Sequence, residues 1–274
     1  MTTPAVHKRA VHKTADGTAY AIAGKGAPMV FVHGVGLCHQ VWDPQIEDFS
    51  RDHQVIAYDT LGHGASPLPA ESMRLDAYIG QLAKLFDDLG LAPATLVGHS
   101  MGALITIGFA LAYPERCRHI VPMNAIFDRS PEHRARSQKT SELLAEGRAG
   151  EILEGTLSRW FAPADKSDPG RAATIEQIRC WLTAADPLGY ARAYRVFAEE
   201  GDAFVGHLGE LPMPALFLTA EGDQNSTPEM SRRMSEAAPR GEVCIIPGER
   251  HMLPAIAPEK VNPALRGFID AAGR

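Results

Sequence analysis

The feature that most constrains this chain is the pentapeptide Gly98-His99-Ser100-Met101-Gly102, which lies between a short β-type run (95–97) and a long apolar run (101–113). A serine centred in Gly-x-Ser-x-Gly between a strand and a helix is typical of a nucleophile elbow. The turn is so sharp that glycine is needed on both sides of the serine. It exposes the hydroxyl beside the N-terminus of the following helix, where backbone N–H groups favour developing negative charge. The pattern therefore predicts that Ser100 is a nucleophile.

Around the pentapeptide, short apolar runs alternate with helical stretches. The runs that predict strands are 29–32, 55–58, 95–97, 119–123, 215–219 and 243–246. Apolar residues at helical spacing predict a helix over 75–89, with Gly90 at its C-cap, and a last helix starts near Glu259. This alternation predicts an α/β fold, with a mostly parallel central sheet and helices on both faces.

The rhythm is interrupted once. Between about 127 and 207 no strand pattern occurs, and amphipathic helices are broken by prolines. We therefore expect a core domain made of residues 1–126 and 208–274, with a helical cap inserted at 127–207. A long insertion in a compact domain usually serves as a lid or a specificity element.

A serine hydroxyl is a poor nucleophile until a base removes its proton. His251 is the histidine that follows the last predicted strand, and its loop can reach back over Ser100. The base needs an acid to orient it, and Asp223 follows the strand 215–219 at the same sheet edge. The order serine, acid, histidine is typical of such sites. Asp128 and Glu221 are the alternatives for the acid.

The tetrahedral oxyanion needs N–H donors. One is expected from Met101, the residue after the nucleophile, and the other from Val35 in the loop after the strand 29–32. The glycines at 34 and 36 let this backbone approach the substrate closely. His33 is expected to brace the loop beside the substrate.

Other classes of function lack their signatures. There is no complete dinucleotide fingerprint, Walker loop, His-Glu-x-x-His motif or cysteine–histidine cluster, so we expect no cofactor and no metal. A net charge of −6 argues against nucleic acid as a binding partner.

The longest apolar run, 101–113, is shorter than the roughly 20 residues that a helix needs to span a bilayer. No signal peptide is visible near Met1, and four scattered cysteines fit a reduced, cytoplasmic protein. The oligomeric state is left open.

With these residues placed, the chain resembles the α/β-hydrolase superfamily over nearly its whole length. The matching segments are His33-Gly34, Gly62-His63-Gly64-Ala65-Ser66, Gly98-His99-Ser100-Met101-Gly102, Gly222-Asp223 and His251. Within the superfamily it is similar to the branch typified by 3-oxoadipate enol-lactonases. That similarity is carried by Val41-Trp42-Asp43-Pro44-Gln45, Ser158-Arg159-Trp160-Phe161, Gly189-Tyr190-Ala191 and Ser226-Thr227-Pro228. Many of those lactonases carry Asn-Ser in place of His33-Gly34, whereas esterases and carbon–carbon bond hydrolases carry His-Gly.

The expected function is hydrolysis of a small carboxylic ester or lactone through an acyl-enzyme on Ser100, with a small molecule as the only partner. In the cap, Trp160 and Trp181 are expected to wall the substrate, or else to form the cap core, and Arg159 to grip a carboxylate. The alternatives are a hydrolase of a carbon–carbon bond in a ring-cleavage product and, from another class, a non-catalytic receptor on the same fold. A perhydrolase side activity is also left open.

Overall fold

The computed structural model describes residues 9–272, so the first eight and last two residues of the expected core segments lie outside it. Its sheet has eight strands in the order β1-β2-β4-β3-β5-β6-β7-β8. The bounds are β1 His12–Lys13, β2 Ala19–Ala23, β3 Ala27–Val32, β4 His53–Tyr58, β5 Ala94–His99, β6 Cys117–Met123, β7 Ala215–Ala220 and β8 Gly241–Ile246. From β4 to β8 all neighbours are parallel, while β2 is antiparallel to β1 and β4. The predicted α/β fold is confirmed.

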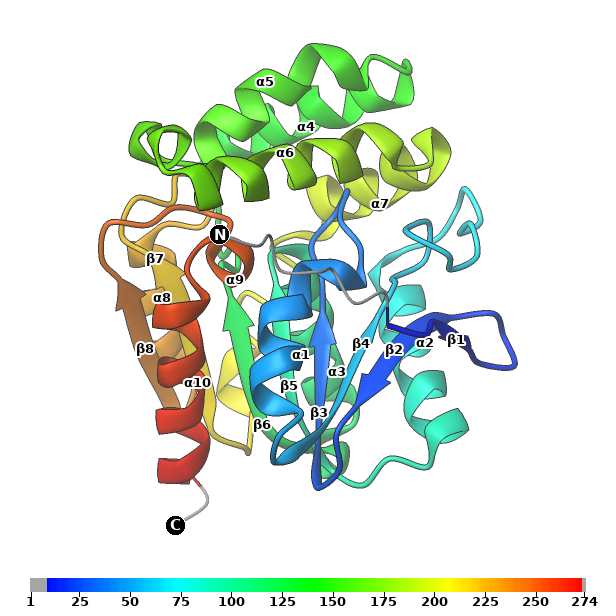
Figure 1. The fold of residues 1–274 in the computed structure, drawn as a ribbon, viewed down its shortest axis with the longest axis vertical. Coiled ribbons are helices and arrows are strands. Elements are labelled where there is room, and N and C mark those ends of the chain that lie inside the picture. The colour runs from blue at the N-terminus through cyan, green and yellow to red at the C-terminus, as the bar shows by residue number, and fades with distance from the viewer. Residues whose placement is uncertain (1–8, 273–274) are drawn as a thin grey trace.

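Helices cover both faces of the sheet (Figure 1). The bounds are α1 Asp43–Phe49, α2 Leu75–Leu89, α3 Met101–Ala112, α8 Pro228–Ala237, α9 Leu253–Ile256 and α10 Pro258–Ala272. Helices α1 and α10 contact each other on one face, and α2 contacts α3 on the other. Gly90 ends α2 in the left-handed conformation, as its position in the sequence predicted.

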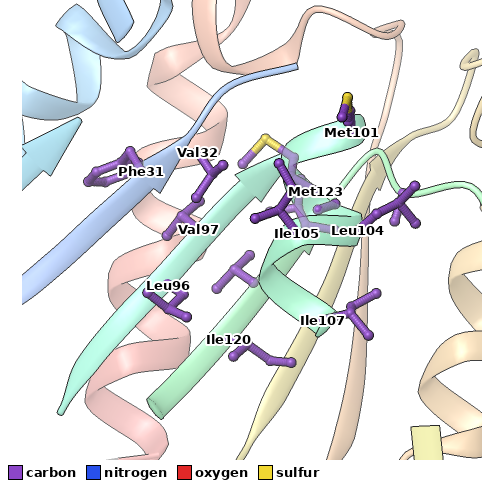
Figure 2. Packing of buried hydrophobic residues seen from close by; sticks show 14 of the residues in the cluster. Phe31, Val32, Leu96, Val97, Met101, Leu104, Ile105, Ile107, Ile120 and Met123 are labelled. Carbon is purple, nitrogen blue, oxygen red and sulfur yellow. The ribbon is translucent and has the colours of Figure 1, made fainter. Parts of the chain in front are cut away.

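The central strands are buried on both faces, which explains why their sequences are continuous apolar runs. Figure 2 shows apolar side chains of β3, β5, β6 and α3 packed together. Helix α3 is buried along most of its length and packs on β5 and β6. This packing fixes the start of α3 relative to the ends of the parallel strands.

Four helices lie between β6 and β7, and Figure 1 shows them above the carboxyl ends of the strands. They are α4 Pro131–Ala145, α5 Ala149–Trp160, α6 Pro169–Ala184 and α7 Pro187–Glu200, and no strand is found among them. Arg171 and Arg250 attach this layer to the loop after β8. Arg171 of α6 bonds buried Glu249 at 2.9 Å, and Arg250 donates to the Ser158 carbonyl at 2.8 Å. The helices therefore cover the edge where the parallel strands end.

The state of the cysteines and the length of the apolar helices can also be compared with the sequence analysis. All four cysteines are unpaired, although Cys38 and Cys117 are buried. Within residues 9–272, no helix combines the length and the apolar character that crossing a bilayer requires.

Candidate active site

The turn around Ser100 has the geometry of a nucleophile elbow. Ser100 separates β5 from α3 and has φ 55° and ψ −116°, a conformation that side-chain-bearing residues rarely adopt. A Cβ placed on Gly98 would lie 2.1 Å from the Gly102 carbonyl oxygen, and one on Gly102 would lie 2.1 Å from that of Val32. Neither position can hold a side chain without moving backbone, which is the physical reason for both glycines.

The loops after β7 and β8 bring Asp223 and His251 together. Nδ1 of His251 lies 2.8 Å from Oδ2 of Asp223, and both side chains are almost fully buried. The other carboxylate oxygen accepts from the backbone N–H of Asn225 at 2.8 Å and of Ser226 at 3.1 Å. Nδ2 of Asn124 donates to Oδ2 at 2.7 Å. The carboxylate is thus held by four donors, counting the imidazole.

These donors set the charge of Asp223. Burial by itself would raise the pKa of this carboxyl, but the charge and hydrogen bond of His251 and the bonds from Ser226 and Asn124 outweigh it. The net result is a pKa below the usual range for aspartate. An ionised Asp223 accepts the Nδ1 proton of His251, which leaves Nε2 with a lone pair for accepting a proton.

The two alternative acids are engaged elsewhere. Asp128 pairs with Arg233 of α8, and Glu221 accepts the backbone N–H of Gly248 at 3.0 Å. His251 contacts neither of them among its described bonds.

Ser100 and His251 face one cavity of about 50 Å³, which α4, α5 and α7 cover. The Ser100 hydroxyl makes no hydrogen bond to a described residue, so its bond to the imidazole is not formed in this arrangement. Catalytic hydrogen bonds are often long in unliganded sites and tighten when substrate binds. The structure therefore brings the two side chains to the same cavity.

Two backbone N–H groups stand free beside the elbow. A Cβ on Gly34 would lie 3.1 Å from the Cβ of Ser100, so the loop after β3 packs directly on the nucleophile. In that loop Val35 lines the cavity, and its N–H meets no described acceptor. Met101 is the first residue of α3, so its N–H has no partner within the helix. Both groups are available to an oxyanion.

His63 holds this loop in place. The Gly36 N–H donates to Nε2 of His63 at 2.8 Å, and Nδ1 lies 3.1 Å from the Leu61 carbonyl oxygen. Burial lowers the pKa of His63 to about 3, with the neighbouring His33 adding to the effect. His63 is therefore neutral, with its proton on Nδ1, and it fixes the residue next to Val35.

We expect His63→Leu to lower kcat by about tenfold to a hundredfold, because a displaced oxyanion donor loses most of its effect. His63→Gln keeps an acceptor near the position of Nε2 and should recover part of the rate. Initial rates on a neutral ester, compared with the melting temperature of each variant, separate this effect from loss of fold. Equal rates in the two variants would contradict the positioning role.

The buried histidines also make stability depend on pH. Burial lowers the pKa of both His63 and His99 to about 3, against about 6.5 in an unfolded chain. Between these values the unfolded chain binds more protons, so the stability of the fold is complete above about pH 6.5 and is lost as the pH falls toward 3. We expect the melting temperature to drop steadily from pH 7 to pH 4. A flat profile over this range would contradict the neutral, buried state of these rings.

The other predicted site residues divide into two groups. Trp160 and Arg159 line the cavity, and the Trp160 ring lies 5.4 Å from that of His251. His33 and Trp181 are not among the residues that line it, and their contact with substrate stays a prediction. The nitrogens of His33 are used by the Gly34 carbonyl and the Thr60 N–H, so His33 braces the loop. Trp181 lines outer hollows beside the loop 37–41.

Several residues of the candidate site are not predicted by the sequence analysis. Asn124 directly follows β6, and its position at the end of a parallel strand is a signal that could have singled it out. His63 sits in a motif that had been used only to identify the fold. Arg129 and Arg136 line the cavity, but nothing in the sequence distinguishes them from the other arginines of the helical segment.

Comparison with known proteins supports the assignment to the α/β-hydrolase fold. The family model described as "alpha/beta hydrolase fold" matches residues 27–167. The chain is 35% identical to the (E)-2-((N-methylformamido)methylene)succinate hydrolase of Acinetobacter baylyi, over 92% of this chain and 93% of that protein. It is 31% identical to 3-oxoadipate enol-lactonase 2 of the same organism, over 62% of each. A thermophilic esterase from Thermogutta terrifontis superposes with a TM-score of 0.85 and 27% identity, covering 97% of this chain and 99% of that one.

Proposed function

This chain belongs to the α/β-hydrolase fold family, and we propose that it is a serine hydrolase that cleaves a small carboxylic ester or lactone through an acyl-enzyme on Ser100. The observation that carries the proposal is the 2.8 Å bond between His251 and Asp223, with His251 lining the same cavity as Ser100. An oriented, buried imidazole beside an elbow serine is the arrangement that activates a hydroxyl.

The proposed reaction has two halves. Nε2 of His251 takes the proton of Ser100 as Oγ attacks the carbonyl, and the N–H groups of Val35 and Met101 stabilise the oxyanion. His251 then gives the proton to the leaving oxygen, the carbon–oxygen bond breaks and the alcohol departs. In the second half His251 deprotonates a water, which attacks the acyl-enzyme, and Ser100 takes the proton back as the acid is released.

We also propose that residues 127–207 act as a cap on this site. Helices α4, α5 and α7 contribute much of the cavity wall, and Trp160 at the end of α5 lies against the His251 ring. A wall of this kind excludes water and strengthens the electrostatic interactions of the triad.

A second candidate is hydrolysis of a carbon–carbon bond in a ring-cleavage product, with His251 moving a substrate proton before Ser100 attacks. One observation favours this second candidate. The relative from Acinetobacter baylyi is named for a methylene-substituted succinate, an unsaturated dicarboxylate that carries a formamide group and no ester.

A substrate panel tests the proposal. We expect the purified protein to hydrolyse p-nitrophenyl acetate and a simple lactone faster than a vinylogous 1,5-diketone, with (E)-2-((N-methylformamido)methylene)succinate as a fourth substrate. Turnover of the diketone alone would overturn the ester proposal in favour of the second candidate. No turnover of any substrate, with an unreactive Ser100, would support the non-catalytic receptor.

A further inference from the structure

The cavity beside Ser100 is strongly basic in an acidic protein. The chain has a net charge of −6, yet the described residues that line this cavity include three arginines, two histidines and no acidic residue. The arginines are Arg129 at the exit of β6, Arg136 of α4 and Arg159 of α5. Three successive parts of the chain therefore place positive charge around one small space.

Only one of these charges is neutralised by a described carboxylate. Arg129 bonds Asp202 through its Nε at 3.2 Å. Arg136 donates to the Gln224 carbonyl at 3.3 Å, and Arg159 donates to the Thr156 hydroxyl at 3.2 Å. Within residues 9–272, neither of these two guanidinium groups forms an ion pair. Two positive charges thus remain without a counter-charge.

Two of these arginines and one histidine of the cavity lining carry buried nitrogens that no described residue bonds. Nε of Arg159 and Nη1 of Arg129 are buried and have no partner among the described residues, and neither has Nδ1 of His133. Burial and the nearby charge of Arg136 lower the pKa of Arg159, which shows how little its charge is stabilised here. Leaving charged donors unsatisfied is costly, and an anion with acceptor oxygens would satisfy them.

The arginines of this cavity differ from most other arginines of the helical layer in their partners. Elsewhere on the same helical layer, arginines pair with acids: Arg179 with Glu154, and Arg195 with Glu199. Among the described arginines of this layer, Arg192 also lacks an acid, but it donates to the Pro69 carbonyl at 2.6 Å and lies outside the cavity. Arg136 and Arg159 are the unpaired ones that face the cavity. No acidic side chain is among the described residues that line this cavity, so its arginines lack the kind of partner that Arg179 and Arg195 have.

We propose that the cavity binds a substrate with two carboxylates, one held by Arg159 and the other by Arg136, while its scissile carbonyl lies at Ser100. Two uncompensated guanidinium groups match a dianion, and their planar forks fit carboxylates bidentately. This inference deepens the proposed function and rests on it for the placement of the reacting bond. The present volume of about 50 Å³ is smaller than the ~150 Å³ that holds a benzene-sized ligand, so binding must displace lining side chains, and Arg136 is exposed.

Calorimetric titration of the Ser100→Ala variant with succinate and with butyrate tests the inference without relying on catalysis. The two ligands have the same carbon chain and differ by one carboxylate. We expect succinate to bind at least about tenfold more tightly, and Arg136→Met or Arg159→Met in this background to weaken succinate binding about tenfold. Lys139→Met removes a charge from the exposed face of α4, outside the cavity, and should leave both affinities unchanged.

The outcomes separate the two proposals. Succinate binding by a protein without esterase activity would leave the dicarboxylate site standing and overturn the ester hydrolase. Ester hydrolysis with no preference for succinate over butyrate, or with a preference that Arg136→Met leaves intact, would overturn the dicarboxylate site alone. Arg136 is exposed, so its variant is expected to fold even where Arg159→Met does not.

Discussion

Ser100→Ala should lower kcat by about four to six orders of magnitude on any ester that the protein hydrolyses. The substitution removes the oxygen that forms the acyl bond and leaves only the oxyanion donors and binding. Its effect on the fold should be small, because the Ser100 side chain makes no capping bond to α3. Initial rates with p-nitrophenyl acetate, together with the melting temperature, measure both quantities.

Ser235→Ala serves as the matched control for this prediction. Ser235 lies on α8, away from the cavity, and its hydroxyl bonds only the Arg232 carbonyl. Its substitution should leave kcat unchanged. Retention of substantial activity by Ser100→Ala, in a preparation free of contaminating esterase, would rule out Ser100 as the nucleophile.

Asp223→Asn should lower kcat by about 10⁴-fold, although the two side chains have nearly the same shape. The amide oxygen is needed by the N–H groups of Asn225 and Ser226, which places the NH₂ where Oδ2 now accepts. That NH₂ would face the Nδ1 proton of His251, donor against donor. The imidazole must then move its proton to Nε2, so it cannot accept the proton of the serine.

Asp128→Asn is the natural comparison, because Asp128 was the rival acid from the sequence. Its carboxylate pairs with Arg233 and not with His251, so we expect its substitution to leave kcat unchanged. A large loss in Asp128→Asn combined with an active Asp223→Asn would reverse the assignment of the acid.

Much of the fold could be predicted because its central strands are buried on both faces and read as continuous apolar runs. The antiparallel strands β1 and β2 were not predicted, since β1 is two exposed residues and β2 is only partly buried. Helices α1 and α8 were also missed. Both are short, and α8 is mostly polar, so neither carries an extended apolar stripe.

In the site, sequence order and position at strand ends predict Ser100, Asp223 and His251, and the structure places Asp223 against His251 and lines one cavity with His251 and Ser100. The helical layer could not be read in the same way. Trp160 and Trp181 lie on amphipathic helices of similar composition, and only the packing of α5 and α6 places one against His251 and the other outside the cavity. Nor could the sequence show which arginines of these helices face the cavity, because contacts between residues distant in the sequence decide which side of a helix packs inward.

The chain is a hydrolase of the α/β fold, and the central claim is that its nucleophile is Ser100, activated by His251. Labelling with a fluorophosphonate followed by peptide mass spectrometry tests this claim most directly, because the probe reacts with an activated serine and needs no knowledge of the substrate. We predict one phosphonyl group per chain, on the peptide that contains Ser100, with labelling strongly slowed in His251→Gln. An unlabelled protein, or a label that persists in Ser100→Ala, would contradict it.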